Sequence, residues 1–133
     1  MSGVVVDTHA LIWYMSASAS LSAPARNALE QAVASGAGIG VSAISLVEIQ
    51  YLVEKGRVPQ AIQERFLQLL AAPDPPLRLV PLDEAVARCL EQVPRDQVPD
   101  MPDRIIAATA VRLGLPLVSR DRKIQTSTVR TIW

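Results

Sequence analysis

The sequence predicts a single α/β domain over residues 1–133, with a mainly parallel central sheet and helices on both of its faces. Three observations lead to this prediction. Short apolar runs, typical of strands buried on both faces, alternate with longer segments that have helical periodicity. The length of 133 residues suits one domain. Hydrophobic residues make up 50% of the chain and charged residues 20%, a balance that provides a core and excludes intrinsic disorder.

The first half of the chain begins with an apolar run at residues 3–6, closed by Asp7, which predicts a buried strand at the centre of the sheet. Trp13 lies on the short helix expected after this strand. Residues 38–41 predict a loop that runs into a second strand. Three further helices, each opened by a capping Ser or a Pro and ended before a Gly or a Pro, are expected at residues 22–35, 43–55 and 59–72.

The second half starts at the Asp-Pro-Pro break of residues 74–76. One helix is expected from the cap Asp83 to about Gln92, and another from Asp103 to the stop at Gly114. Between them, three prolines predict a stiff loop: Pro94, Pro99 and Pro102. Short apolar runs predict the remaining strands, at residues 77–80, 117–119 and 129–132.

Overall charge and composition narrow the function classes. Basic and acidic residues number 13 each, so the zero net charge gives no sign of a nucleic-acid partner. Aromatic residues, at 4%, leave few rings for stacking on single-stranded nucleic acid. One cysteine, Cys89, excludes an intramolecular disulfide, a thiolate zinc cluster and a CxxC redox site. Asp7 and His9 interrupt the apolar N-terminal run, so we expect no signal peptide or membrane span, and a soluble cytoplasmic protein.

Four acidic residues are expected at one edge of the sheet, because ligands of parallel α/β sheets bind beyond the carboxyl ends of the strands. Asp7 follows the first strand and Asp121 follows the strand at residues 117–119. Glu48 shares a helical stripe with apolar residues, and Asp103 heads the apolar stripe of its helix. Each acid alone also has a structural interpretation: a cap of the turn after the strand for Asp7, a half-exposed helix residue for Glu48, a first-turn acid for Asp103, and a charged surface turn for Asp121.

A convergence of four acids would favour a bound cation. Two unit charges 4 Å apart repel by roughly 4 kcal/mol at an effective dielectric of 20. Oxygen ligands without a His or Cys cluster select Mg²⁺ or Mn²⁺, which can polarise a phosphoryl oxygen and activate water. The pattern therefore favours phosphodiester hydrolysis.

Four blocks of the sequence closely resemble the PIN-domain ribonucleases, and within them the VapC-type toxins of prokaryotic toxin–antitoxin pairs. They occur in the family's order, span nearly the whole chain and cover residues 4–13, 42–48, 103–110 and 117–121. The resemblance implies a three-layer α/β/α fold and an Mg²⁺- or Mn²⁺-dependent endoribonuclease. It also implies an RNA substrate, a cognate antitoxin and a homodimer.

The resemblance assigns roles to residues of this chain. The catalytic acids would be Asp7, Glu48, Asp103 and Asp121. Asp7 and Asp103 would bind metal, with Asp121 for a second ion, while Glu48 would position or deprotonate the attacking water. Whether one or two metals act, and whether Asp121 faces the site, stays open. Ser119 matches the family's hydroxyl residue near the fourth acid, where it would orient a water or a phosphate oxygen, and Asp100 is an auxiliary candidate.

Basic residues gather late in the chain. Residues 104–133 carry six basic side chains and one acidic one, and three of them flank Asp121: Arg120, Arg122 and Lys123. These three are candidates for contacts with RNA phosphates, the alternative being an ordinary solvated surface. His9 is either a general base or, as we favour, a residue that shapes the pocket.

Two other function classes compete with the nuclease. The first is a catalytically silent PIN-like domain that binds RNA or protein. The second is a phosphatase or receiver with a strand-end Asp nucleophile, which we rank last because Asp7-Thr8-His9 lacks the second Asp of the phosphatase pattern.

Overall fold

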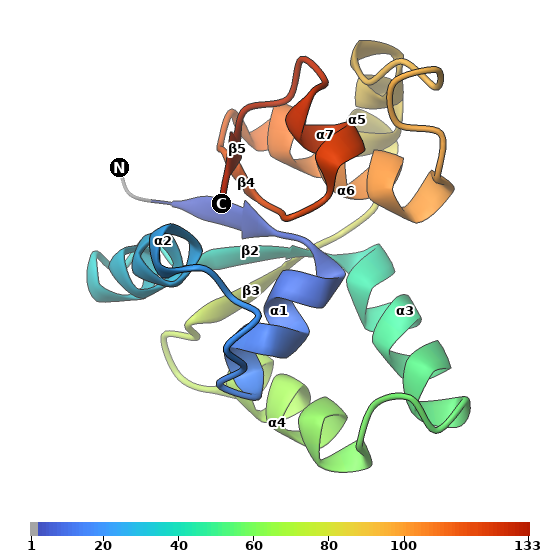
Figure 1. The fold of residues 1–133 in the computed structure, drawn as a ribbon. Helices are drawn as coiled ribbons and strands as arrows, with labels where there is room; N and C mark the ends of the chain where they lie inside the picture. The colour runs from blue at the N-terminus through green and yellow to red at the C-terminus, as the bar shows by residue number, and fades with distance from the viewer. Residues whose placement is uncertain (1–2) are drawn as a thin grey trace.

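A parallel sheet forms the centre of the computed structural model, which describes residues 3–133 (Figure 1). All neighbouring strands are parallel, in the order β3-β2-β1-β4-β5, so the first strand is central as predicted. Val6 of β1 is in register with Val41 on one side and Val118 on the other. The strands are β1 (Val4–Val6), β2 (Ile39–Ser42), β3 (Leu77–Val80), β4 (Leu117–Val118) and β5 (Thr131–Ile132).

Helices connect the strands and cover both faces of the sheet. They are α1 (Thr8–Met15), α2 (Ala23–Ala34), α3 (Ala43–Glu54), α4 (Gln60–Ala71), α5 (Glu84–Arg88), α6 (Met101–Leu113) and α7 (Arg122–Gln125), with a 3-10 turn at Cys89–Gln92. The predicted caps Ser22, Ser42 and Asp83 each accept a hydrogen bond from a backbone amide of the helix that they open. The local capping chemistry therefore sets these helix starts.

The alternation of side chains along β1 produces the three layers. Val4 and Val6 face a core shared with α1, α2 and α4, whereas Val5 faces a second core shared with α5, α6 and α7. Figure 1 shows these two groups of helices on opposite sides of the sheet. The α/β/α expectation is therefore confirmed. Within residues 3–133, no helix has both the length and the apolar character needed to cross a membrane.

Several boundaries differ from the sequence prediction. The helix capped by Asp83 tightens into a 3-10 turn before Pro94, since a residue that precedes proline disfavours helical backbone. Pro102 belongs to the first turn of α6 and not to the loop, because a proline in a first helical turn removes no helical hydrogen bond. The last strand starts at Thr131 and not at residue 129, and the strand expected to reach Ser119 ends at Val118. The short helix α7, capped by Asp121, was not expected at all.

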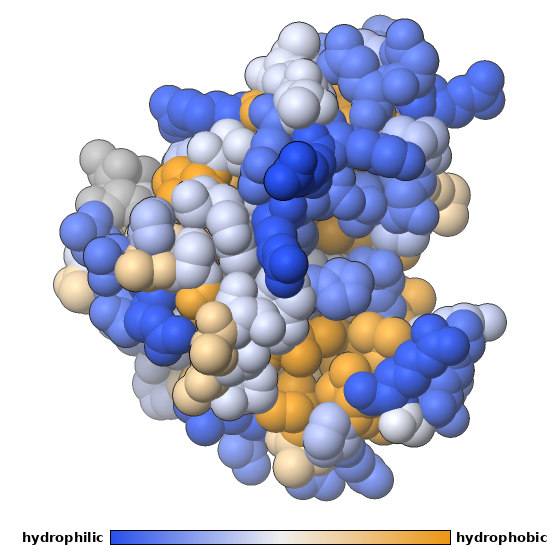
Figure 2. Space-filling view, viewed as in Figure 1, coloured by the Kyte–Doolittle hydropathy of each residue, from blue (hydrophilic) through white to orange (hydrophobic). Residues whose placement is uncertain are grey.

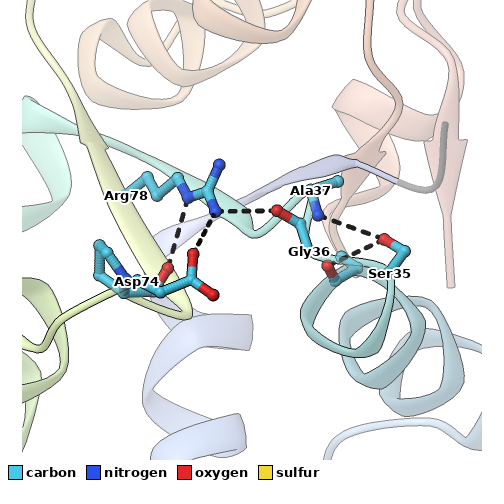
Figure 3. Close-up of polar contacts among 7 residues, drawn as sticks. Ser35, Gly36, Ala37, Asp74 and Arg78 are labelled. Atoms are coloured by element: carbon cyan, nitrogen blue, oxygen red, sulfur yellow. Dashed lines mark hydrogen bonds and ion pairs between the residues drawn. The ribbon is translucent and has the colours of Figure 1, made fainter.

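Arg78 of β3 ties the amino end of the sheet together. Its guanidinium donates a 2.8 Å hydrogen bond to the backbone oxygen of Gly36 and forms an ion pair with Asp74 at 3.4 Å (Figure 3). It also packs against Gly38, whose φ of +78° suits glycine. These contacts join the loop after α2 to the edge strand, at the end of the sheet opposite Asp7.

Candidate functional site

Acidic side chains converge on one cleft at the carboxyl edge of the sheet. The cleft has a volume of about 520 Å³, within the range typical of ligand sites. Its eight lining residues are Asp7, His9, Trp13, Glu48, Asp100, Asp103, Arg120 and Asp121. All four acids proposed from the sequence thus lie around a single cavity, together with Asp100.

Asp7 is placed by the end of β1 and held by both of its carboxylate oxygens. It caps α1, with Oδ1 accepting a hydrogen bond from the Ala10 amide at 2.9 Å, while Oδ2 accepts one from the Ser119 hydroxyl at 2.5 Å. Burial raises the pKa of the Asp7 carboxyl, and the hydrogen bonds from Ser119 and Ala10 oppose this rise. Each oxygen keeps a second lone pair, so these bonds orient Asp7 without using up its capacity to bind a cation.

Ser119 joins two of the acids from the interior. It is fully buried, donates its single hydroxyl proton to Asp7, and accepts a 3.1 Å hydrogen bond from the Asp121 amide. Asp121 in turn caps α7 by accepting from the Ile124 amide at 3.1 Å. Ser119 is not among the residues that line the cleft, whereas Asp121 is. The structure therefore directs Asp121 toward the other acids and makes Ser119 a support beneath them.

Glu48 is connected to the first block through Thr8. The Thr8 hydroxyl donates a 2.6 Å hydrogen bond to Oε1 of Glu48 and lies 2.9 Å from the Ser45 hydroxyl. A threonine has one hydroxyl proton, so Ser45 must donate to Thr8 when Thr8 donates to Glu48. Burial raises the pKa of Glu48, and the bond from Thr8 acts against that rise. Our sequence reasoning missed Thr8 and Ser45, although the position of Thr8 directly after Asp7 was a usable signal.

Asp103 carries the least compensated charge in the cleft. Burial, followed by the charges of Asp100, Asp121, Glu48 and Asp7, raises the pKa of Asp103 from 3.8 to about 7. Asp100 caps α6 by accepting a 3.2 Å hydrogen bond from the Asp103 amide. These two acids thus share the first turn of α6, where a helix N-terminus favours negative charge. That local effect does not offset the repulsion between Asp103 and the neighbouring carboxylates. A cation bound in the cleft would offset it.

The basic residues proposed from the sequence divide into two groups. Arg120 is exposed and lines the cleft. Arg122 and Lys123 are exposed on α7 beside Asp121 but are not among the lining residues. Arg104, from the same basic stretch, has a structural role: its guanidinium donates to the backbone oxygens of Val93 and Leu90 and fastens the proline-rich loop.

The cleft offers oxygen donors to a cation but no closed cage. Within residues 3–133, no group of three or more His, Cys, Asp or Glu side chains is arranged to hold one ion directly. A hydrated Mg²⁺ typically takes only one or two carboxylates and keeps several waters, so such a cage is not required. Asp7 and Asp103 can supply these one or two carboxylates, since both line the cleft and burial disfavours the charge of each.

Known proteins resemble this chain in sequence and in fold. The family model of the PIN domain matches residues 4–127. The chain belongs to the PIN domain family. It is 33% identical to Ribonuclease VapC22 of Mycobacterium tuberculosis over 126 residues, which are 94% of this chain and 92% of that protein. The crystal structure of VapBC2 from Rickettsia felis, bound to a DNA fragment from their promoter, shares the fold with a TM-score of 0.71 and 18% identity, covering 97% of this chain and 96% of that one. The resemblance to VapC-type PIN proteins is thus confirmed.

Proposed function

We propose that this PIN domain is a divalent-metal-dependent endoribonuclease that hydrolyses RNA phosphodiester bonds at the acidic cleft. The observation that carries the proposal is the convergence of five acids on one cavity, one of which has a pKa of about 7. Such an arrangement suits a cation, and the similarity to Ribonuclease VapC22 supports RNA as the substrate.

The residues divide the work according to their positions. Asp7 and Asp103 would hold Mg²⁺ or Mn²⁺, and Asp121 would hold a second ion where one binds. When bound, the metal supplies Lewis-acid polarisation of the phosphoryl oxygen and a more acidic water. Glu48, kept in place by Thr8, would orient the attacking water and accept its proton. Ser119 would keep Asp7 and Asp121 in position from below.

The basic side chains near Asp121 would bind the RNA backbone. Arg120 at the cleft, with Arg122 and Lys123 on α7, would contact phosphates and so bring a polyanion to an acidic site. Strongly hydrophilic side chains cover this part of the molecule in Figure 2, around α7.

The test is cleavage of structured and single-stranded RNA by the purified protein in Mg²⁺ or Mn²⁺. We expect EDTA or Asp7→Asn to abolish cleavage and Asp96→Asn, an exposed acid outside the cleft, to leave it unchanged. Asparagine is also a good helix cap, so Asp7→Asn keeps the start of α1. Undiminished cleavage by Asp7→Asn would contradict the assignment of the acidic cleft as the active site. RNA retention without any cleavage by the wild type would favour the catalytically silent alternative.

We further propose that the protein is the toxin of a toxin–antitoxin pair and blocks translation by cutting RNA. An apolar groove of about 470 Å³ adjoins the acidic cleft and shares His9 and Glu48 with it, and Val47, Tyr51 and Met101 in its wall are exposed. Such a surface suits the cognate antitoxin. Expression in a bacterium should arrest growth, and co-expression of the neighbouring gene should relieve the arrest. Growth without arrest from a cleavage-competent protein would contradict the toxin assignment.

The pairing of two copies and a cytoplasmic location also belong to this proposal. Light scattering of the purified protein should give the mass of a homodimer, and a mass of about 14 kDa at micromolar concentration would contradict that pairing.

A further inference from the structure

Both tryptophans of the chain meet beside the acidic cleft. Trp13, on α1, lies among the residues that line the cleft, and Trp133 is the last residue of the chain. Their rings are 5.8 Å apart at an interplanar angle of 61°, an edge-to-face arrangement. Both side chains are half-buried and pack against the core beneath α1 and α2. The indole of Trp13 is therefore fixed from behind while one part of it faces the cleft.

Two exposed planar groups lie close to this indole. The His9 ring lies 6.0 Å from the Trp13 ring, tilted by 44°, and the Arg120 guanidinium carbon lies 5.6 Å from the centre of the same ring. His9 precedes Trp13 by four positions on α1, so the helical spacing brings these two rings together, whereas Arg120 reaches Trp13 from the segment after β4. Both line the cleft that Asp7 and Asp103 also line.

Neither group has a partner that would explain its position by stability alone. Across residues 3–133, the His9 ring and the Arg120 guanidinium make no hydrogen bond and no ion pair with protein groups. An exposed cation–aromatic contact contributes only about 0.5–1 kcal/mol, so it orients the arginine more than it stabilises the fold. The polar edges of both groups remain free to bind a ligand.

We infer that His9 and Arg120, supported by Trp13, form a subsite for an unpaired nucleobase next to the phosphate that is cut. This inference rests on the proposed ribonuclease function and specifies how the same cleft holds its substrate. Proteins recognise unpaired RNA bases by stacking them on aromatic rings and on guanidinium planes. Trp13 acts as a positioning residue, because the Arg120 guanidinium lies over its ring and its side chain is half-buried, whereas His9 and Arg120 are exposed.

The charge of the cleft favours an uncharged nucleobase at the surface formed by His9, Trp13 and Arg120. The five carboxylates of the cleft repel every phosphate except the one that the bound cation and the N–H edge of Arg120 would hold. A neutral base meets no such repulsion. Stacking of the base on His9 and Arg120 does not depend on which base it is. The subsite therefore selects unpaired nucleotides over paired ones without reading a particular base.

The first experiment measures binding without cleavage. In the Asp7→Asn, Trp133→Phe double variant, Trp13 is the sole tryptophan and reports on the subsite by its fluorescence. A short oligoribonucleotide should quench this emission and bind about 5- to 100-fold more tightly than the same strand with abasic sites, which keeps every phosphate. Equal binding and equal quenching by the abasic strand would show that the subsite recognises phosphate only, and would overturn the inference.

The second experiment separates this inference from the nuclease assignment. His9→Ala and Arg120→Ala should each raise the KM for single-stranded RNA about fivefold or more, with a smaller change in kcat, and Arg112→Ala, in the last turn of α6 remote from the cleft, should not. Arg120→Lys keeps the positive charge but lacks the planar guanidinium group, so it should behave like Arg120→Ala. No cleavage by the wild type contradicts the nuclease, whereas normal cleavage by all three subsite variants contradicts the subsite alone.

Discussion

Asp103 offers a direct measurement of the electrostatics of the cleft. Burial and four neighbouring acids raise its pKa from 3.8 to about 7 in the folded protein. The folded state therefore binds the Asp103 proton more tightly than the unfolded state, and this contribution to stability is complete below about pH 4. It is lost as the pH rises to about 7, above which the ionised carboxylate destabilises the fold. An asparagine at this position would lack the charge at every pH, so Asp103→Asn should be more stable than the wild type at pH 8.

The size of the effect follows from the shift. Each pKa unit corresponds to 1.36 kcal/mol, so a rise from 3.8 to about 7 sets a ceiling of about 4 kcal/mol. Asp103 is only partly buried, and solvent screening reduces the expected gain to about 1–2 kcal/mol. For a domain of this length such a gain raises Tm by about 5 °C.

The assay is thermal unfolding followed by circular dichroism, in EDTA, from pH 4 to pH 8. We expect the Tm difference between Asp103→Asn and the wild type to be near zero at pH 4 and about 5 °C in favour of the variant at pH 8. Asp96→Asn, at an exposed position outside the cleft, should show no such trend. Adding Mg²⁺ at pH 8 should stabilise the wild type more than Asp103→Asn. A variant equal to or less stable than the wild type at pH 8 would refute the reasoning.

Three further predictions follow from individual contacts. Ser119→Ala leaves Asp7 Oδ2 and the Asp121 amide without their partner, so the free energy of unfolding should fall by about 1–3 kcal/mol in urea titrations; a loss below about 0.5 kcal/mol would contradict the supporting role. Thr8→Val removes the hydrogen bond that lowers the pKa of Glu48, so the acidic limb of the cleavage pH profile should move to higher pH, and an unmoved limb would exclude Glu48 as the base. Gly114→Ala, at φ +66°, should cost about 1 kcal/mol of stability, and a neutral result would show that this helix end tolerates a side chain.

Much of the fold was predictable because its signals are local. Ser22, Ser42 and Asp83 mark helix starts through bonds to amides two or three residues away, and Gly114 marks the end of α6 by its left-handed backbone. The failures have local causes as well. Asp121 caps a helix of only four residues, too short for an apolar period to be recognised, so the periodicity predicts no helix at α7.

The acids of the cleft could be proposed because parallel strands end at a common edge. Asp7 and Asp121 follow β1 and β4, which are neighbours in the sheet. The supporting residues could not be proposed in the same way. Ser119 reaches Asp7 across 112 positions of sequence, and Thr8 reaches Glu48 across 40, so no local pattern records these pairs.

By itself, therefore, the sequence determined the alternation of strands and helices, the acids at the strand ends and the resemblance to the PIN family, because each depends on periodicity, capping or a contiguous motif. Only the tertiary structure decided that Asp121 faces the other acids, that Arg104 fastens a loop, and that the Arg120 guanidinium lies over Trp13 beside the cleft. These outcomes depend on which strand lies beside β1 and on how side chains from distant segments pack. The order of strands in a sheet brings such segments together, and no short stretch of sequence encodes it.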